Sequence, residues 1–337
     1  MPGLRLRPLT VDDEAAALRA HDELTAGGFR FLQEHQPGLS WAAYVERVGG
    51  WRRGVDLPDG FVPSAFLVAV VGDDIVGRVS VRLREDDEGL ILRRNGHIGY
   101  GVRPAFRRRG YASEMLRQSL VVARAHGFER VLVTCDDDNL ASAGVIERAG
   151  GVEDAPDVDE ALGTKRRFWL EPGPDELWLR PLTDDDEKVA LLAHDELAAD
   201  DFSFLLDRGR VDTWPEYVAL MRQWHRREDL PADRVHAAFL VAQVGADVVG
   251  RVSIRFELND HLRREGGHIG YGVRPAFRRR GYAGEMLRRS LVLTRAEGVD
   301  HALLTCDDDN EASARTIEAG GGVEEPGEDG VRRFWIA

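Results

Sequence analysis

The sequence lacks several features that would place the protein in a specialised class. No apolar run approaches the roughly 20 residues of a membrane-spanning helix, and residues 1–10 lack the apolar core of a signal peptide. Only two of its 337 residues are cysteines, too few for a fold built on several disulfides. It also lacks an excess of positive charge, because its formal net charge is -14. We therefore expect a cytoplasmic protein that binds neither membranes nor nucleic acid.

The sequence contains one long stretch twice, since Gly96–Ala112 recurs unchanged as Gly267–Ala283. Shorter identical segments, including AFLVA, VGRVS and TCDDDN, flank both copies in the same order. The two cysteines occupy equivalent positions, so a disulfide within one repeat is excluded. Repeats of this length predict two whole domains rather than a solenoid. We place an N-terminal domain at residues 1–171, an exposed linker rich in proline and acidic residues at 172–176, and a C-terminal domain at 177–337.

Each half shows the same predicted order of elements, β-α-α-β-β-β-α-β-α-β-β. Alternating apolar residues and turn residues indicate the strands, and apolar residues at helical spacing indicate the helices. In the first half we expect strands at 4–9, 66–71, 75–83, 96–102, 131–135 and 167–170, and helices at 12–24, 41–48, 110–126 and 139–149. The predicted fold class is α/β with a mixed sheet in each half.

The repeated stretch predicts an anion-binding turn. In each copy a glycine-rich strand passes through three arginines and a glycine, Gly110 or Gly281, into a helix. The first N–H groups of a helix have no helical partner, and the helix dipole adds positive charge there. A glycine lacks the Cβ that would keep a ligand away, and the arginines supply charge. The alternative is a charged turn that only caps the helix.

The spacing Arg-x-x-Gly-x-Ala at Arg107–Ala112 and Arg278–Ala283 resembles the acyl-CoA signature of the GNAT superfamily of N-acyltransferases. The resemblance covers the element order of both halves and is closer to an uncharacterised branch of predicted acetyltransferases with a GGHIGYGVRP pattern. It implies two tandem GNAT-fold domains that form a pseudo-dimer within one chain. It also implies transfer of acetyl from acetyl-CoA to a small primary amine by direct attack in a ternary complex.

The resemblance further implies the cofactor contacts. The turn would cradle the pyrophosphate, the preceding strand would pair with the pantetheine arm, and an asparagine that opens the next helix would contact the pantetheine end. Gly99 and Gly101 fit a local bulge in that strand. The asparagines serve equally well as plain helix N-caps. In the first half the implied residues are Gly101, Val102, Arg107, Arg108, Arg109, Gly110, Tyr111, Ala112, Ser113 and Asn139. In the second half they are Gly272, Val273, Arg278, Arg279, Arg280, Gly281, Tyr282, Ala283, Gly284 and Asn310.

The catalytic groups depart from the family pattern. Family members often carry a general-acid tyrosine seven residues after that asparagine, and here Ile146 and Ile317 stand there. His97 and His268 begin the glycine-rich strand and are candidates for the general base, because histidine titrates near neutral pH. Ordinary hydrogen-bonded histidines are the alternative. The remaining catalytic candidates are Tyr100 and Tyr271.

Other polar residues have two interpretations each. Asp136–Asp138 and Asp307–Asp309 either recruit a cationic amine or are solvated residues before a helix. Cys135 and Cys306 have no adjacent histidine and are expected to be buried strand ends rather than nucleophiles. No cluster predicts a metal site. The missing tyrosine leaves two alternatives to a doubly active enzyme: an acyl-CoA-binding regulatory protein without turnover, or one catalytic and one structural half.

Overall fold

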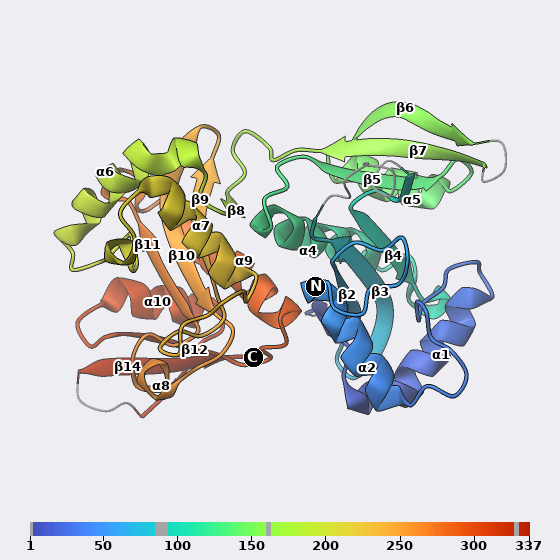
Figure 1. Ribbon diagram of the computed structural model, residues 1–337, viewed down its shortest axis with the longest axis horizontal. Helices are drawn as coiled ribbons and strands as arrows, with labels where there is room; N and C mark the ends of the chain where they lie inside the picture. The colour runs from blue at the N-terminus through green and yellow to red at the C-terminus, as the bar shows by residue number, and fades with distance from the viewer. Residues whose placement is uncertain (1–2, 85–93, 160–162, 327–329) are drawn as a thin grey trace. The chain divides into compact units, whose positions relative to one another are not determined.

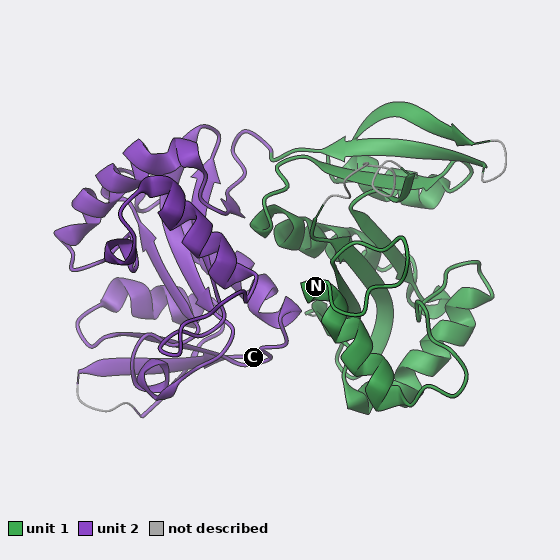
Figure 2. Cartoon of the chain, viewed as in Figure 1, with its two compact units in different colours: residues 1–172 green, residues 173–337 purple. Residues whose placement is uncertain are grey.

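The computed structural model describes residues 3–84, 94–159, 163–326 and 330–337. The chain divides into two compact units, Met1–Pro172 and Gly173–Ala337, which Figure 2 shows in different colours. The expected α/β class is confirmed in both, and the sheet of unit 1 is mixed, with a parallel contact between two of its strands. None of the helices in the described ranges is long and apolar enough to cross a membrane.

Unit 1 has the predicted order of strands and helices (Figure 1). Its strands are β1 (Arg5–Pro8), β2 (Ser64–Val71), β3 (Asp74–Arg82), β4 (Ile98–Val102), β5 (Val131–Asp136), β6 (Val152–Asp159) and β7 (Gly163–Leu170). Its helices are α1 (Glu14–Thr25), α2 (Trp41–Gly50), α4 (Tyr111–Ala125) and α5 (Leu140–Arg148). The observed ends of the elements differ from the expected ones by a few residues. The helix expected from Asp12, for example, is preceded by a 3-10 turn at Val11–Asp13, and α1 itself begins at Glu14.

Unit 2 repeats this order and has a short helix after β10. Its strands are β8 (Trp178–Arg180), β9 (Ala237–Val244), β10 (Asp247–Arg255), β11 (Ile269–Val273), β12 (Ala302–Asp307), β13 (Val323–Glu325) and β14 (Val331–Ile336). Its helices are α6 (Glu187–Ala198), α7 (Trp214–His225), α8 (Asp260–Arg264), α9 (Tyr282–Ala296) and α10 (Glu311–Ala319). Residues 85–93, which precede β4 as α8 precedes β11, lie outside the described residues.

Each sheet opens at its centre. In unit 1 the strand order is β1-β2-β3-β4-β5-β7-β6, and the parallel contact between β4 and β5 consists of the pair Ile98 and Val133. Beyond this pair the two strands diverge. In unit 2 the corresponding strands form two separate sheets. A four-stranded sheet has β11 at one edge, and a three-stranded sheet has β12 at one edge. Within the described residues, one edge of β4 and of β11 therefore has no strand partner on the way to the arginine-containing turn.

The bulge predicted at Gly99 and Gly101 is wrong. β4 pairs with β3 in a continuous register from Ile98, opposite Val81, to Val102, opposite Gly77. The register shift lies in the preceding hairpin of β2 and β3 instead. The opening comes from the divergence of β4 and β5, which is a contact between segments distant in the sequence.

The helices cover both faces of each sheet. In unit 1, α1 and α2 pack on β2 and β3, while α4 packs on β3 and β4 and contacts α5. Trp51, Tyr44 and Phe31 are fully buried in the core beneath α1 and α2. Burial of side chains of this size contributes on the order of 2–3 kcal/mol each. The packed core holds β3 and β4 in place below the site.

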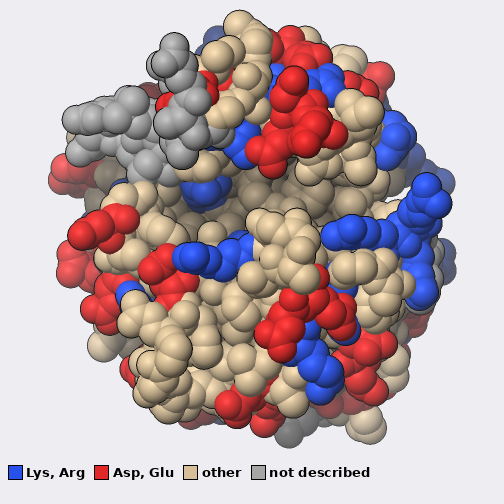
Figure 3. Space-filling model, turned by 90° about the vertical axis from the view of Figure 1, so that its right-hand side faces the viewer, with Lys and Arg blue, Asp and Glu red and all other residues tan. Residues whose placement is uncertain are grey.

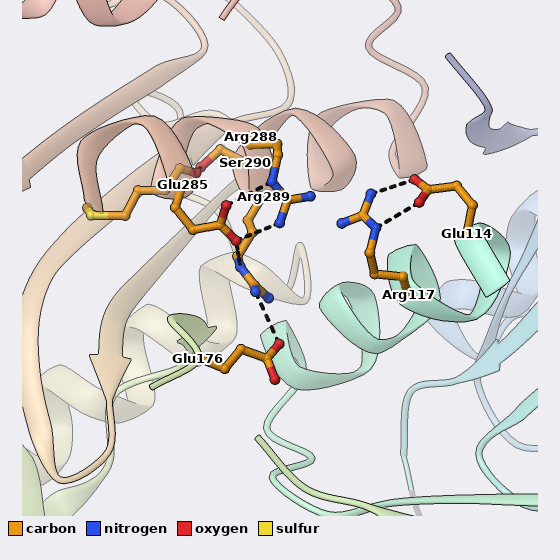
Figure 4. Close-up of polar contacts among 8 residues, drawn as sticks. Glu114, Arg117, Glu176, Glu285, Arg288, Arg289 and Ser290 are labelled. Carbon is orange, nitrogen blue, oxygen red and sulfur yellow. Dashed lines mark hydrogen bonds and ion pairs between the residues drawn. The ribbon is translucent and has the colours of Figure 1, made fainter. Parts of the chain in front are cut away.

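The same helical position ties the first strand of each unit to its long helix. In unit 2, Nη2 of Arg289 donates to Glu176, just before β8, at 3.1 Å (Figure 4). In unit 1, Gln118 stands at this position of α4. Its amide donates to the carbonyl of Leu4 at 2.9 Å and accepts from the N–H of Leu6 at 3.3 Å. The linker at 172–176 and the domain limits drawn from the sequence stay predictions.

Candidate functional site

The turn between β4 and α4 has the backbone that the repeated stretch predicts for anion binding. Gly110 is the N-cap of α4 in the left-handed region, with φ of 79°, and Gly281 repeats this at 81°. Arg108 and Arg279 also have positive φ, 61° in both cases, which is costly for a residue with a Cβ. A Cβ added at Gly110 would meet nothing within 4 Å. The backbone conformation, rather than crowding, therefore favours glycine here.

The first turns of α4 and α9 have no side-chain cap from their N-cap residues. By contrast, the N-cap side chains of α2, α5, α7, α8 and α10 each accept a backbone N–H. These capping residues are Ser40, Asn139, Thr213, Asn259 and Asn310. A glycine N-cap leaves the first N–H groups of α4 and α9 directed at the solvent in front of the turn. The turn can therefore accept an anionic ligand through its backbone.

The arginines surround this turn on the surface. Arg107, Arg108 and Arg109 are exposed, and Nε of Arg107 donates to the carbonyl of Val102 at 3.1 Å. Figure 3 shows a hollow on the face of unit 1, with Lys and Arg side chains as well as Asp and Glu side chains at its rim. The structure thus brings the predicted strand and turn residues together at one place.

The turn of unit 2 differs in one charge. Arg278 corresponds to Arg107 and forms an ion pair with Asp200, whereas unit 1 has Gly27 at the position of Asp200. The remaining arginines of the turn, Arg279 and Arg280, are exposed like their counterparts. Partial neutralisation of Arg278 lowers the positive charge available to a phosphate in unit 2.

An arginine fixes the end of β4 just before the turn. Arg103 donates through Nε and Nη2 to Glu23 of α1 at 2.9 and 2.6 Å. Its Nη1 donates to the carbonyl of Ile75 at 2.8 Å. Arg274 and Glu196 repeat the pair in unit 2. The start of each anion-binding turn is thereby anchored to the helix that covers the other sheet face.

The glycines of the central strand make room on one side of the sheet. A Cβ added at Gly101 would lie 2.7 Å from the ring of Phe29, so the ring requires a glycine there. At Gly99 no atom of the described residues lies within 4 Å of an added Cβ. At the equivalent Gly270, Nη1 of Arg255 would lie 3.2 Å from the added Cβ. Open space in unit 1 is therefore occupied by a guanidinium group in unit 2.

His97 and His268 lie in an environment that argues against the predicted base role. Nδ1 of His97 accepts the N–H of Leu132 at 2.9 Å, and the N–H of His97 donates to the carbonyl of Leu132 at 2.6 Å. The ring is 2% exposed, and its buried Nε2 has no hydrogen-bond partner among the described residues. Burial lowers the pKa of both histidines to about 4. His97 thus joins the two strands at the point where they diverge, and base catalysis by it stays a prediction.

Tyr100 and Asn139 meet at the start of α5. The hydroxyl of Tyr100 lies 3.0 Å from Oγ of Ser142, and Oδ1 of Asn139 accepts the N–H of Ser142 at 3.1 Å. Burial raises the pKa of Tyr100 to about 12. Tyr271, Asn310 and Ser313 repeat the arrangement, with 3.3 Å between the hydroxyls. Both asparagines are therefore N-caps, and their cofactor contacts stay predictions.

The residues with two interpretations have the following surroundings, and their roles stay predictions. Asp136 pairs with Lys165 at 2.5 Å and is exposed. Burial raises the pKa of Cys135 and Cys306, which opposes the thiolate form. Ile146 is fully buried, as is Ile317. The described residues contain no group of three or more possible metal ligands.

Sequence reasoning missed a row of arginines on the face of β3 and β10 that looks toward α1 and α6. Arg78 and Arg251 are 3% exposed and lie over phenylalanine rings. Arg82 and Arg255 follow four residues later and donate to backbone carbonyls. The signal was present, because GRVSVR and GRVSIR alternate arginine or serine with apolar residues at the period of a strand.

Solved structures similar to this chain are acetyltransferases. The microcin C7 self-immunity acetyltransferase MccE, in complex with acetyl-CoA and AMP, shares 17% identity at a TM-score of 0.35, covering 48% of this chain and 93% of that chain. RimL, a ribosomal L7/L12 alpha-N-protein acetyltransferase in complex with coenzyme A, shares 18% at 0.36, covering 51% and 95%. The GNAT domain of PAT from S. lividans shares 18% at 0.34, covering 55% and 96%. None of the curated proteins matches this chain.

The family comparison matches both halves of the chain. A model described as acetyltransferase (GNAT) domain matches residues 3–152 and again residues 176–323. Each match includes one anion-binding turn and the strand that precedes it. Because the two matches together span well over half of the sequence, the chain belongs to the GNAT acetyltransferase domain family and carries that domain twice in tandem.

Proposed function

We propose that each unit binds acetyl-CoA and transfers its acetyl group to the nitrogen of a small primary amine. The observation that carries this proposal is the uncapped first turn of α4 and α9 behind a left-handed glycine, surrounded by exposed arginines in both units. Membership of the GNAT acetyltransferase family supports the reaction class. A cytoplasmic location and a place in the GGHIGYGVRP branch are further parts of the proposal.

The chain's own groups fit such a ligand in two places. The free N–H groups at the start of α4, with Arg107 and Arg108, match a pyrophosphate in charge and donor type. The free edge of β4 beyond Ile98 presents backbone groups that can pair with an extended amide-containing arm, as an added strand does. Asn139 uses Oδ1 in its cap and keeps its amide N–H groups for the end of that arm.

In the proposed step the amine nitrogen attacks the thioester carbonyl carbon. The new C–N bond forms, the C–S bond breaks, and the sulfur leaves as a thiolate that takes up a proton. We assign the donor at the thiolate to Tyr100 and Tyr271. Their hydroxyls stay protonated at neutral pH because burial raises the pKa of both. Ile146 and Ile317 have no proton to give.

We assign His97 and His268 a positioning role. Each holds two diverging strands through a backbone N–H bond to Nδ1. Because burial keeps both rings neutral far below pH 7, the proton of the amine passes to solvent in this proposal. The histidines then control the width of the opening in which the thioester lies.

Calorimetry and thiol release test the proposal together. Titration of the chain with acetyl-CoA should give a stoichiometry near two, and free thiol should appear when a primary amine is added. Tight binding without thiol release across a broad panel of amines would contradict transfer and favour an acyl-CoA-binding regulator. The buried isoleucines at the positions of the family's tyrosine are the observation behind that second candidate. A stoichiometry of one would favour a single catalytic half.

A further inference from the structure

Unit 2 contains a cavity of about 430 Å³ between α7, α8, β9 and β10. Met221 and Trp224 of α7, Phe239 of β9 and Leu262 of α8 give it apolar walls. Ser253 and Arg255 of β10 contribute polar groups to its lining. A cavity of this size with apolar walls and a few polar groups suits a small organic ligand.

The acidic residues of the cavity are already neutralised. Asp207 forms ion pairs with Arg210 and Arg234. Asp233 pairs with the same two arginines. Both carboxylates therefore have their counter-ions within the protein and are poorly suited to hold a cationic amine.

Arg255 is a cation without an anionic partner among the described residues. Its Nη1 donates to the carbonyl of Gly266 at 3.1 Å, and no carboxylate lies within ion-pair distance in the described part of the chain. Arg251 lies four residues before Arg255 on the same face of β10. It donates to the carbonyls of Ser203 and Phe204. Desolvated guanidinium groups bound only to carbonyls favour a nearby anion.

Ser253 adds a hydroxyl beside this cation. It is 4% exposed, and no hydrogen bond to its hydroxyl is formed within the described ranges. In unit 1 the equivalent Ser80 accepts from Arg78 at 2.5 Å and donates to Gln33 at 3.1 Å. Unit 2 has Leu206 at the position of Gln33. The serine hydroxyl is thus satisfied within the protein in unit 1 and available in unit 2.

The cation lies next to the strand that carries the proposed reaction. Nη1 of Arg255 would be 3.2 Å from a Cβ added at Gly270 of β11. β11 is the strand whose free edge and turn form the acetyl-CoA site of unit 2 in the proposed function. An anion bound by Arg255 would therefore sit close to the amine that attacks the thioester.

We propose that unit 2 takes an amino carboxylate with an apolar side chain, whose carboxylate binds Arg255 and Ser253 and whose side chain fills the cavity. This inference rests on the proposed function for the reaction and on the cavity for the acceptor class. One guanidinium and one hydroxyl can bind a single carboxylate. Because Arg255 lies close to β11, the amine that reacts there must be close to that carboxylate in the same molecule. The acetyl group would then form an amide with the amino nitrogen of this acceptor.

Binding of leucine, leucinamide and an aminoalkylphosphonate of the same side chain tests the inference. Calorimetry is carried out on the full chain saturated with coenzyme A, so that binding is measured without turnover. We expect leucine to bind and leucinamide to bind about ten- to a hundred-fold more weakly, because it lacks the charge that pairs with Arg255. Equal affinity for leucine and leucinamide, tighter binding of the phosphonate than of leucine, or no binding of leucine would each overturn it.

One test variant and two matched controls, Arg255→Lys and Arg82→Gln, complete the experiment. Arg255→Gln should abolish the preference for leucine over leucinamide, Arg255→Lys should retain part of it, and Arg82→Gln in unit 1 should leave it unchanged. A preference that survives in Arg255→Gln would overturn the inference, even if that variant is less stable. Thiol release is read separately, so leucine binding without thiol release contradicts the proposed transfer and leaves the acceptor site supported.

Discussion

His97, just before β4, and Tyr100, within β4, have different surroundings. The His97 ring packs against Phe128 and Trp169, with ring centroids 4.5 and 6.4 Å apart. The Tyr100 hydroxyl reaches Ser142 at the start of α5. The His97 ring is enclosed by aromatic rings, whereas the Tyr100 hydroxyl contacts a polar helix end. Alternation along the chain separates the two side chains, but their protonation depends on the groups that surround each of them.

The histidines should make folding stability depend on pH. Burial lowers the pKa of His97 and His268 from 6.5 to about 4, so between these values the unfolded chain binds protons that the folded chain does not. Their contribution is complete above about pH 6.5 and is lost as the pH falls toward 4, with a slope of up to about 1.4 kcal/mol per pH unit for each histidine. Denaturant unfolding at pH 7.5 and 5.0 measures it.

The double variant His97→Asn and His268→Asn is the matched comparison, since an amide oxygen can still accept the backbone N–H. It should lose much less stability between pH 7.5 and 5.0 than the unchanged chain. The acid limb of kcat/KM should be the same in both. A shift or loss of that limb, with turnover reduced about 10²- to 10⁴-fold, would restore the histidines as the general base.

The tyrosines should affect turnover without affecting cofactor affinity. Tyr100→Phe combined with Tyr271→Phe removes the hydroxyl that lies beside Ser142 or Ser313. We expect kcat to fall about 10²-fold, the low end for loss of a general acid, because a thiolate leaves readily. The dissociation constant of acetyl-CoA should change little. Unchanged turnover would exclude the hydroxyls as donors and leave the thiolate to solvent.

At the scale of elements, the long helices α4 and α9 act through their first turns. Each begins behind a left-handed glycine, and each is held at its centre to the first strand of its own unit by Gln118 or Arg289. The helix therefore presents its N-terminus from a fixed position. The opening between β4 and β5 supplies the other half of the site, because it frees a strand edge beside that N-terminus.

A charge placed at one helix start should remove one cofactor site. Gly110→Asp adds a carboxylate where the phosphate is expected, and Gly110→Asn adds a side chain of nearly equal shape without the charge. Both residues tolerate the left-handed conformation. We expect acetyl-CoA stoichiometry to fall from two to about one for the aspartate variant, with a smaller loss of affinity for the asparagine variant. Equal effects of the two would assign the loss to shape or folding rather than to charge.

For the molecule as a whole, the two units are more alike on the proposed cofactor side than on the proposed acceptor side. The turn sequence is identical in the two units, but the residues around Ser80 and Ser253 bond differently. The proposed cofactor side differs in one ion pair, because Arg278 is paired with Asp200 where unit 1 has Gly27. The two units are therefore expected to differ more in the acceptors that they take than in cofactor binding.

Variants that disable one unit at a time should show this difference. We expect Gly281→Asp to remove most of the turnover of an amino carboxylate, because Arg255 and its cavity belong to unit 2. Gly110→Asp should retain more than half of it. Thiol release with leucine as acceptor measures both rates. Equal rates for the two variants would contradict a division of acceptors between the units.

The sequence by itself determined the duplication, the order of elements and the place of the arginine- and glycine-containing turn before each long helix. These features depend on local patterns: periodic apolar residues, a glycine that adopts positive φ, and arginines beside a helix start. Gly110 and Gly281 have the predicted helix-start position for this reason. The element ends moved by a few residues because capping and 3-10 turns shift them.

Only the tertiary structure decided the surroundings of the strand histidines, the opening between β4 and β5, and the pairing of the arginines on β3 and β10. His97 is bonded to Leu132 and Arg251 to Phe204, and in each case the partners are far apart in the sequence. Burial and hydrogen bonding across such distances set the pKa of His97 and leave Arg255 without a carboxylate partner among the described residues. Local sequence patterns carry no information on which distant groups will enclose a charge, because the packing of the whole unit brings them together.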